Sequence, residues 1–407
     1  MVTVDHAAPP FRLGRYEVRA KIADGGMAAV YVARRAEGGA AAAPAQGQPG
    51  ELVAVKMVRE EFARNKEFLT MFLDEARIAA RLAHPNIVRY HELGDDGGHA
   101  YIAMELLLGQ SLWSVWDACR ARGVRLRYDM IAWVGARVAE GLHYAHELED
   151  EQGRPLDIVH RDVNATNIFV TYDGTIKIID FGLAKAANRA SKTAAGIIKG
   201  KVAYMSPEQA VGAPIDRRTD VFALGTTLWE LACDRRLFKH ADEVETLKRV
   251  HAAEVPNPLE IVDGFPPALW RVLERALARD KERRYATAGA LAHDLDAFAA
   301  GAVDPGVVAA VMQELFGADR ARQERWIAEA SRREPRVLEP LKSPSTFRTA
   351  ADRPVPQSGP AQGPPPVGFA PAPVAPTTGL QSRSPIALTL AVAIVLAVIV
   401  VAALALR

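Results

Sequence analysis

The spacing of apolar residues changes along the chain, from a strand-like period near the N-terminus to a helical period further on. Alternating apolar and polar positions predict strands at 16–22 and 30–33 around a turn of small residues, and an apolar run predicts a strand at 52–56. Apolar residues three and four positions apart predict long helices at 60–82 and 112–146. The pattern indicates a β-rich first part followed by a larger helical part.

Two acidic turns lie between short apolar runs in the middle of the chain. The runs at 157–159, 167–170 and 176–179 predict three strands. Asp162 comes soon after the first run and Asp180 directly after the third, and Asn167 begins the second. Carboxylate and amide oxygens on tight loops can bind divalent cations that hold a phosphate chain. We therefore interpret Asp162, Asn167 and Asp180 as a candidate site for metal, phosphate and a nucleophile.

The C-terminal part contains two contrasting segments. Residues 343–385 hold 11 of the 26 prolines and predict a disordered or polyproline-like linker. Residues 386–406 carry no charge and one polar side chain, Thr389, which predicts a single membrane-spanning helix. Because the N-terminus has no apolar run typical of a secretion signal, we expect a C-terminal anchor with the folded part in the cytoplasm.

Composition restricts the functional classes. The chain has 407 residues, of which 49% are hydrophobic, and its formal net charge is +1. The hydrophobic fraction predicts a sizeable core. The nearly neutral charge argues against nucleic-acid binding, for which a clear basic excess is typical.

Metal-ligand patterns are missing among the cysteines and histidines of the sequence. Cys119 and Cys233 lie far apart, which is typical of reduced thiols in a reducing compartment. His143 and His146 lie one helical turn apart, but no acid or cysteine accompanies them in a metal-binding pattern. We interpret both histidines as packing residues.

Two features upstream of the acidic turns could bind phosphate. The small residues around Gly25 and Gly26 would let backbone amides approach phosphate oxygens, although such turns are common in ordinary hairpins. Lys56 lies among apolar strand positions, where an ammonium group needs a partner, and Glu75 on the next predicted helix is a candidate. Taken alone, Lys56 and Glu75 could equally be two solvated charges.

Several weak motifs follow one another in a specific order. They are Gly25 with Val30, Val53-Ala54-Val55-Lys56, Glu75, His160-Arg161-Asp162 with Asn167, Asp180-Phe181-Gly182, Ser206-Pro207-Glu208, Asp220 and Arg284. Over roughly residues 16–300, this series resembles the signature set of the eukaryotic-like protein kinases. The turn at Gly25, the segment at 204–209 and the predicted span look most like the bacterial membrane-anchored serine/threonine kinases.

The resemblance implies an α+β, bilobal protein-kinase fold, with a small β-rich N-lobe that has one main helix and a larger helical C-lobe. The expected parts are a flexible N-terminus at 1–15, a kinase domain at 16–300 with lobes at 16–106 and 107–300, a helical extension at 301–342, the linker at 343–385 and the transmembrane helix at 386–406. The extension carries an apolar stripe that includes Val308, Met312 and Leu315. We expect this stripe to pack on its own domain rather than on another chain.

The resemblance also implies roles for the candidate catalytic residues. Lys56 would hold the α and β phosphates of ATP, and Glu75 would orient Lys56. Asp180 would bind one Mg²⁺ ion and Asn167 a second, with Mn²⁺ as an alternative metal. Asp162 would accept the proton of the attacking hydroxyl. The implied nucleotide pocket comprises Ile22, Ala23, Asp24, Gly25, Gly26, Val30, Ala54, Lys56, Met104, Glu105 and Leu107.

Three positions depart from the family pattern. Ala23 and Ala28 stand where the family usually has glycine, which should tighten nucleotide access. Asn164 stands two residues after Asp162, where serine/threonine kinases usually have a lysine that contacts the γ-phosphate. Lys201 replaces a usual threonine, and we hypothesise that its charge substitutes for that missing lysine.

The basic segment at 183–204 is a candidate regulatory loop. It contains Ser191 and Thr193, and Arg161 beside Asp162 would pair with a phosphorylated loop hydroxyl. We expect autophosphorylation of Thr193, or else Ser191, with self-association as the route to reaction in trans. The other expected partners are protein substrates with serine or threonine and the lipid around the C-terminal span, with no nucleic acid.

Three alternatives remain open at this stage. A pseudokinase scaffold would bind nucleotide and partners with little turnover. The departures at Ala23, Ala28 and Asn164 favour this alternative, and the presence of Lys56, Asp162, Asn167 and Asp180 argues against it. A small-molecule phosphotransferase shares the acids, but Ser206-Pro207-Glu208 is typical of a peptide-docking platform. Tyrosine as the acceptor is disfavoured because the sequence at 204–208 resembles that of the serine/threonine kinases.

Overall fold

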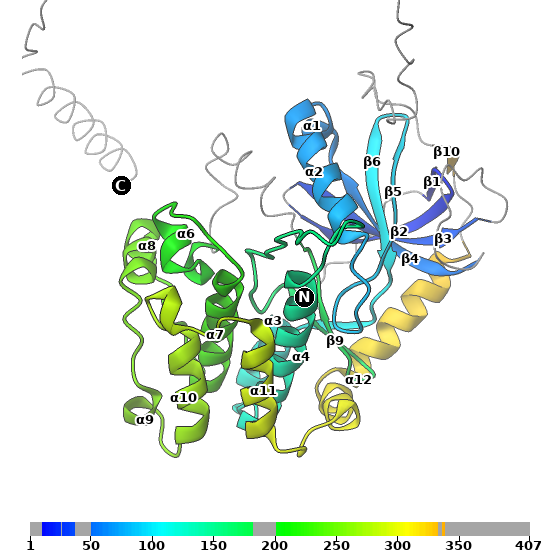
Figure 1. Ribbon diagram of the computed structural model, residues 1–407. Coiled ribbons are helices and arrows are strands. Elements are labelled where there is room, and N and C mark those ends of the chain that lie inside the picture. Colours follow the sequence, from blue (N-terminus) through cyan, green and yellow to red (C-terminus); the bar gives the residue numbers. More distant parts are fainter. Residues whose placement is uncertain (1–9, 26, 37–49, 182–200, 333–335, 338–407) are drawn as a thin grey trace, which may run out of the picture. The chain divides into compact units, whose positions relative to one another are not determined.

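A mixed sheet forms the first half of the structure (Figure 1). The structure is a computed structural model that describes residues 10–25, 27–36, 50–181, 201–332 and 336–337. The strand order in the sheet is β10-β1-β2-β3-β4-β6-β5, with β10 parallel to β1 and the other neighbours antiparallel. The strands are β1 (Phe11–Leu13), β2 (Tyr16–Asp24), β3 (Ala28–Arg35), β4 (Leu52–Val58), β5 (Tyr90–Asp96), β6 (His99–Glu105) and β10 (Arg336–Val337).

The sheet fixes the position of Lys56. In β4, Lys56 is registered against Val30 of β3 on one side and Ile102 of β6 on the other. The helices α1 (Glu60–Ala63) and α2 (Lys66–Ala79) follow β4 directly. The middle of a sheet hydrogen-bonded on both sides is a rigid place from which to project a functional side chain.

Helices dominate the second half, together with a three-stranded sheet of order β7-β8-β9. Its strands are β7 (Gly109–Ser111), β8 (Ile168–Thr171) and β9 (Ile176–Ile178). The helices are α3 (Leu112–Ala121), α4 (Tyr128–His146), α6 (Pro207–Ala210), α7 (Arg218–Cys233), α8 (Glu243–Ala252), α9 (Pro258–Ile261), α10 (Pro267–Ala276), α11 (Ala288–Ala299) and α12 (Pro305–Ala330), with 3₁₀ turns η1 (Lys201–Tyr204) and η2 (Lys281–Arg283). The expected β-rich and helical halves are both present.

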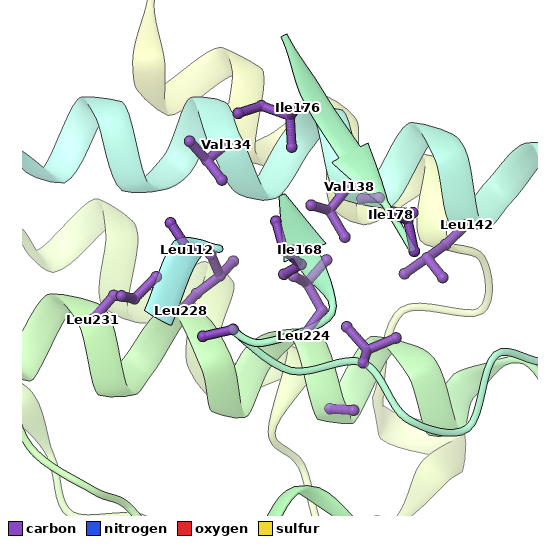
Figure 2. Close-up of a cluster of buried hydrophobic side chains, with 14 of the residues drawn as sticks. Leu112, Val134, Val138, Leu142, Ile168, Ile176, Ile178, Leu224, Leu228 and Leu231 are labelled. Carbon is purple, nitrogen blue, oxygen red and sulfur yellow. The ribbon is translucent and has the colours of Figure 1, made fainter. Parts of the chain in front are cut away.

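The main core lies beneath the small sheet. Figure 2 shows Ile168, Ile176 and Ile178 of β8 and β9 between apolar side chains of α4 and α7. Every residue of α7 from Thr219 to Cys233 is buried, as expected for a helix that is largely apolar on all sides. The loops before β8 and after β9, which carry Asp162 and Asp180, are therefore attached to a tightly packed base.

Two predicted helices are each divided into two. Residues 60–82 form α1 and α2 with a break at Arg64–Asn65, and Asn65 caps α2 by accepting from the Phe68 amide at 3.0 Å. Residues 112–146 form α3 and α4, because Gly123 adopts a φ of +67° and ends α3. The amides of Gly123 and Val124 donate to the carbonyls of Arg120 and Cys119, which is a Schellman motif.

The strand predicted at 157–159 is wrong. These residues have no strand partner, and Asp157 has a φ of +46°, outside the extended region. Ile158 is nevertheless buried in the core. Its apolar character reflects tertiary packing of a loop rather than a strand.

The helical extension packs on its own domain, as the apolar stripe predicted. Val308, Met312 and Leu315 of α12 are buried in the main core, and Arg122 donates to the Leu315 carbonyl at 2.9 Å. Phe316 interrupts the helical geometry with a kink. Within the described ranges, no helix is long and apolar enough to cross a membrane, and the predicted span at 386–406 lies outside those ranges, as does the linker at 343–385.

Candidate active site

Lys56 and Asp180 form an ion pair between the two sheets. The Lys56 Nζ atom lies 2.5 Å from Asp180 Oδ1, and the Lys56 side chain is only 15% exposed. A nearly buried ammonium group needs such a partner, because leaving it unpaired would cost several kcal/mol. The structure thus brings together two predicted site residues that are 124 positions apart in sequence.

The backbone beside Asp180 is held in a left-handed conformation. Asp180 has a φ of +60°. Phe181, the next residue, is buried, and its ring meets the His160 ring edge-on with 4.6 Å between centroids. Non-glycine residues at positive φ cost on the order of 1 kcal/mol and persist where the surroundings impose them. The Phe181–His160 contact is one element of those surroundings, and it links the two acidic turns.

The carboxylate of Asp162 is held by two asparagines. Asn167 Nδ2 donates to Asp162 Oδ2 at 3.0 Å, and Asn164 Nδ2 donates to Asp162 Oδ1 at 3.0 Å. Both amides also donate to the Asp162 carbonyl, at 2.8 Å and 2.9 Å respectively. The plane of the carboxylate is therefore fixed from both sides.

Asn164 is itself fixed by its neighbours. Its Oδ1 accepts from the Thr166 amide at 2.9 Å and from Thr166 Oγ1 at 2.5 Å. Asn164 is 4% exposed. An asparagine that bonds to the backbone two residues later is a common turn device. At this position the turn directs the amide onto the predicted base instead of directing a cation toward phosphate.

The buried carboxylate of Asp220, on α7, holds the loop that carries Asp162. Its two oxygens accept from the amides of His160 and Arg161, each at 2.8 Å, and one of them also contacts His146 Nε2 at 2.8 Å. Burial alone would raise the pKa of Asp220, but the hydrogen bond and charge of His146 and the neighbouring His160 hold that pKa below its usual value. Arg161 adopts a φ of +68° within this arrangement.

His146 thus differs from the packing residue that the sequence suggested. It is fully buried, but it binds the acid that supports the catalytic loop. The two residues are 74 positions apart, so no local pattern could have paired them. The one available signal was the presence of a histidine and an aspartate at otherwise apolar positions of buried helices.

The predicted nucleotide-pocket residues cluster around the strands of the first sheet. Ala23 of β2 is registered against Val30 of β3, and Ala54 of β4 against Met104 of β6. Ile22 and Asp24 lie at the same end of β2 as Ala23, and Leu107 follows β6 and packs on the main core. The structure therefore brings these predicted pocket residues onto adjoining strand ends.

The turn after β2 needs a glycine at position 25. The Gly25 amide donates to the Ala28 carbonyl at 2.9 Å, and a Cβ atom at Gly25 would lie 2.9 Å from that same oxygen. Asp24, beside it, accepts from Lys21 and from Arg59, each at 3.0 Å. The turn is thus closed by backbone and side-chain contacts together.

Glu105 contributes differently from the other pocket residues. Its Oε1 atom accepts from Lys177 Nζ at 2.7 Å and from the Arg89 amide at 2.7 Å. The carboxylate is therefore engaged in an ion pair, and the Glu105 amide donates to the Arg89 carbonyl at 2.9 Å.

A bidentate ion pair anchors the segment after the predicted regulatory loop. Arg284 donates to both carboxylate oxygens of Glu208 at 2.7 Å and 2.9 Å. Burial alone would raise the pKa of Glu208, but the hydrogen bonds and charge of Arg284 keep that pKa below its usual value. Gln209, the next residue, donates to the Arg161 carbonyl at 3.4 Å. The segment that begins α6 is therefore connected directly to the catalytic loop.

Some predicted features lie outside what the structure describes. These are the side chains of Glu75 and Lys201, and the residues Gly26, Gly182, Ser191 and Thr193. The Lys56–Glu75 pair, the phosphorylation of the loop and the substitute role of Lys201 stay predictions.

The donor set suits magnesium bound to a nucleotide. Asp180 offers carboxylate oxygens, and Asn167 uses its Nδ2 on Asp162, which leaves its Oδ1 without a hydrogen bond in the described part of the chain. Hard oxygen ligands of this kind match Mg²⁺, which usually takes one or two protein ligands and completes its shell with phosphate and water. In keeping with that incomplete set, the described residues contain no cluster of three or more His, Cys, Asp or Glu that could hold a metal by itself.

Comparison with known proteins agrees with this arrangement. A model of the protein kinase domain matches residues 16–295, and the chain belongs to that family. The solved kinase domain of PknI from Mycobacterium tuberculosis superposes with a TM-score of 0.53 over 71% of this chain and 98% of that one, at 24% identity, and so supports the bilobal fold.

The names of the curated relatives include kinases of two acceptor types, tyrosine and serine/threonine. The tyrosine-protein kinase MasK of Myxococcus xanthus is 38% identical over 70% of this chain and 43% of its own length. The serine/threonine-protein kinases PknL and PknA of Mycobacterium tuberculosis are 35% and 34% identical over 70% and 72% of this chain, and over 66% and 63% of their own. The chain thus matches between about two fifths and two thirds of the length of these relatives.

Proposed function

We propose that this chain catalyses ATP- and magnesium-dependent transfer of the γ-phosphoryl group to serine and threonine hydroxyls of proteins. The observation that carries the proposal is the fixed carboxylate of Asp162 beside Asn167, whose Oδ1 has no hydrogen bond among the residues that the structure describes and could bind metal. The Lys56–Asp180 pair supplies the cation and the second metal ligand that the same reaction needs.

Each residue has a separate role in the proposed reaction. Asp162 accepts the proton of the incoming hydroxyl, whose oxygen forms a bond to the γ-phosphorus as the bond to the bridging oxygen of ADP breaks. Lys56 neutralises charge on the α and β phosphates. Asp180 and Asn167 would hold Mg²⁺, which would neutralise negative charge on the phosphate oxygens. Asn164 and Asn167 keep Asp162 in one orientation, which is the positional contribution of the loop.

This distribution of roles favours turnover over a pseudokinase scaffold. Lys56, Asp162, Asn167 and Asp180 are all present with side chains of the required type. The lysine missing at position 164 lowers the positive charge near the γ-phosphate. Its replacement keeps the base oriented, so we expect a reduced rate rather than a lost reaction.

The acceptor type has two candidates. Serine and threonine are favoured by PknL and PknA. The loop at 183–204 contains Ser191, Thr193 and Tyr204, and of these Tyr204 is buried and donates to Glu230 Oε2 at 2.9 Å. Tyrosine is favoured by the likeness to MasK. Incubation with ATP and Mg²⁺, followed by phosphopeptide mapping of the protein and of a generic basic substrate, tests the proposal. Phosphoserine and phosphothreonine that vanish in Asp162→Asn support it, whereas phosphotyrosine alone overturns the acceptor assignment.

Regulation by self-modification forms part of the proposal. Phosphate on Thr193, or else Ser191, would pair with Arg161 and order the loop, and self-association would allow one copy to modify another. The double variant Ser191→Ala/Thr193→Ala should lose activation by preincubation with ATP. Full activity in a chain that carries no phosphate on either residue would contradict this part.

Attachment to the cytoplasmic face of a membrane completes the proposal. It rests on the uncharged segment at 386–406 and the proline-rich linker before it. Deletion of 386–406 should move the protein from the membrane fraction to the soluble fraction of a cell lysate. If the truncated chain stays with the membrane, another feature anchors it.

A further inference from the structure

A basic groove lies on the helical half, beyond the Glu208–Arg284 ion pair. It has a volume of about 910 Å³ and is lined by residues in or next to α6, α8, α10 and η2. Six of its lining side chains are basic: His251, Arg271, Arg275, Arg279, Lys281 and Arg283. No residue of the proposed catalytic set lines it, so it is a separate feature of the surface.

The positive charge in the groove is not balanced by its own acids. Three acids line it, Glu208, Glu274 and Asp280, and Glu208 is already engaged by Arg284, which does not line the groove. Asp280 accepts from the Glu282 amide at 3.0 Å and so caps η2. Lys281 pairs with Asp216, outside the lining, at 3.1 Å. The four arginines then still outnumber Glu274 and Asp280, and an excess of positive charge of this kind suits an anionic ligand.

Some basic side chains of the groove contact neighbouring residues, and others could bind a ligand. Arg279 donates to the His251 carbonyl at 3.1 Å, and Arg275 lies 4.2 Å from the centroid of the Tyr285 ring. Arg271 and Arg283 are exposed, and within the described chain the side chain of neither makes a hydrogen bond or an ion pair. Two unpaired guanidinium groups match carboxylates well, because each can bind a carboxylate with two parallel hydrogen bonds.

An apolar surface adjoins the groove. Val244 and Leu247 of α8 are 61% and 37% exposed, and they share a helix face with His251, which lies two turns after Val244 and one turn after Leu247. Val211, which lines the groove, is 59% exposed. These are three of the six large apolar residues classed as exposed in the described ranges, so the exposure is concentrated here.

We propose that this surface docks an acidic segment of the protein substrate, with an apolar residue on α8 and carboxylates in the groove. The segment Pro207–Gln209 supports this occupant, because Glu208 lines the groove while Gln209 contacts the Arg161 carbonyl beside Asp162. The tail of this chain does not fit, because residues 338–407 have two acids against five basic residues. The inference rests on the proposed protein kinase function and names a class of substrate for it.

Direct binding tests the inference without any need for catalysis. The full chain in detergent is titrated, without ATP, into a fluorescent peptide of two leucines followed by six glutamates, and anisotropy is read. We expect saturable binding that weakens with salt, and a loss of at least about tenfold in Arg271→Glu/Arg283→Glu, as removal of two charge-assisted contacts predicts. The matched control is Arg325→Glu/Arg332→Glu, which reverses two exposed arginines of or beside α12 and should leave binding unchanged.

Steady-state kinetics separate docking from the chemical step. A serine peptide that carries the acidic segment should have a KM at least about tenfold higher with Arg271→Glu/Arg283→Glu than with the unaltered chain, at unchanged kcat. A serine peptide without the segment should show no difference. Unaltered melting of the variant by circular dichroism verifies that it folds.

The outcomes distinguish the two proposals. Binding that depends on Arg271 and Arg283 supports the groove even if no phosphate is transferred, in which case the kinase proposal fails alone. Normal transfer with binding and KM unaffected by the double substitution overturns the groove. Light scattering that shows a dimer dissociated by the substitution also overturns it, because the occupant would then be a second copy of the chain.

Discussion

Asn164 donates its side-chain amide to Asp162 Oδ1 at 3.0 Å, at the position where the serine/threonine kinases that the chain resembles usually have a lysine. A lysine there adds charge near the transferred phosphoryl group, whereas this asparagine adds a second constraint on the base. The chain has therefore exchanged electrostatic stabilisation for orientation. This exchange makes the residue at 164 a positioning residue whose effect can be measured.

Asn164→Asp should lower kcat about ten- to a hundredfold, as loss of a well-placed general base contact predicts. The substitution keeps the oxygen that accepts from Thr166 but replaces the donor with a negative charge beside Asp162. A like charge favours protonated Asp162, so the acid limb of the pH–rate profile should move to higher pH. The measurement is ADP release between pH 5 and 9.

Asn164→Ala is the matched variant for that experiment. It removes the donor without adding charge, so kcat should fall and the acid limb should move to higher pH by less than in Asn164→Asp. If both variants move the limb equally, the effect comes from disruption of the loop and not from the contact with Asp162.

The sequence predicted the site more completely than the contacts that support it. Lys56 lies in a short apolar strand and Asp180 soon after another, and Asp162 could be found from the His160-Arg161-Asp162 motif. The Asp220–His146 contact could not, because burial and partnership across 74 positions leave no periodic signal. The role of Asn164 was missed for a different reason, since family comparison showed what was absent but not what the new side chain binds.

The predicted boundaries of helices and strands were wrong where a local turn interrupts a run of apolar residues. The stripe from 112 to 146 continues through Gly123, yet the left-handed conformation available to glycine ends α3 there. Residues 157–159 are apolar because the loop is buried, and burial is not specific to strands.

Lys56→Met should reduce kcat/KM for ATP by about a thousandfold or more, a loss of about 4 kcal/mol of transition-state stabilisation. The variant removes the Lys56 ammonium group that lies 2.5 Å from Asp180 Oδ1. Coupled ADP release measures the effect. Arg325→Met, a change of an exposed cation on α12, serves as the control, and equal losses in the two variants would contradict a specific role for Lys56.

Asp220→Asn should destabilise the fold by about 2–4 kcal/mol at pH 7, because a charged acceptor of three hydrogen bonds is replaced by a neutral one. Since the pKa of Asp220 is lowered in the folded chain, its ionisation stabilises the fold above the ordinary aspartate pKa of about 4, and this contribution is lost as pH falls below that value. The gap in unfolding free energy between the unaltered chain and the variant should therefore shrink below about pH 4. Urea unfolding at several pH values measures it, with Asp263→Asn, on the surface, as the control.

Met312→Ala should cost about 2–4 kcal/mol of unfolding free energy, the usual range for truncation of a buried methionine. Met312 is 1% exposed and lies in the same core cluster as α3 and α4, so its loss leaves a cavity inside the domain that carries the active site. Because α12 continues toward β10, which pairs with β1 of the first sheet, the extension contacts both halves of the fold (Figure 1). We therefore expect Met312→Ala to lower the melting temperature of the whole catalytic domain in a single transition. Gln313→Ala, on the exposed face of the same helix, should leave it unchanged. If the domain melts at its usual temperature in Met312→Ala while self-association is lost, α12 is an interface between chains and not part of the domain core.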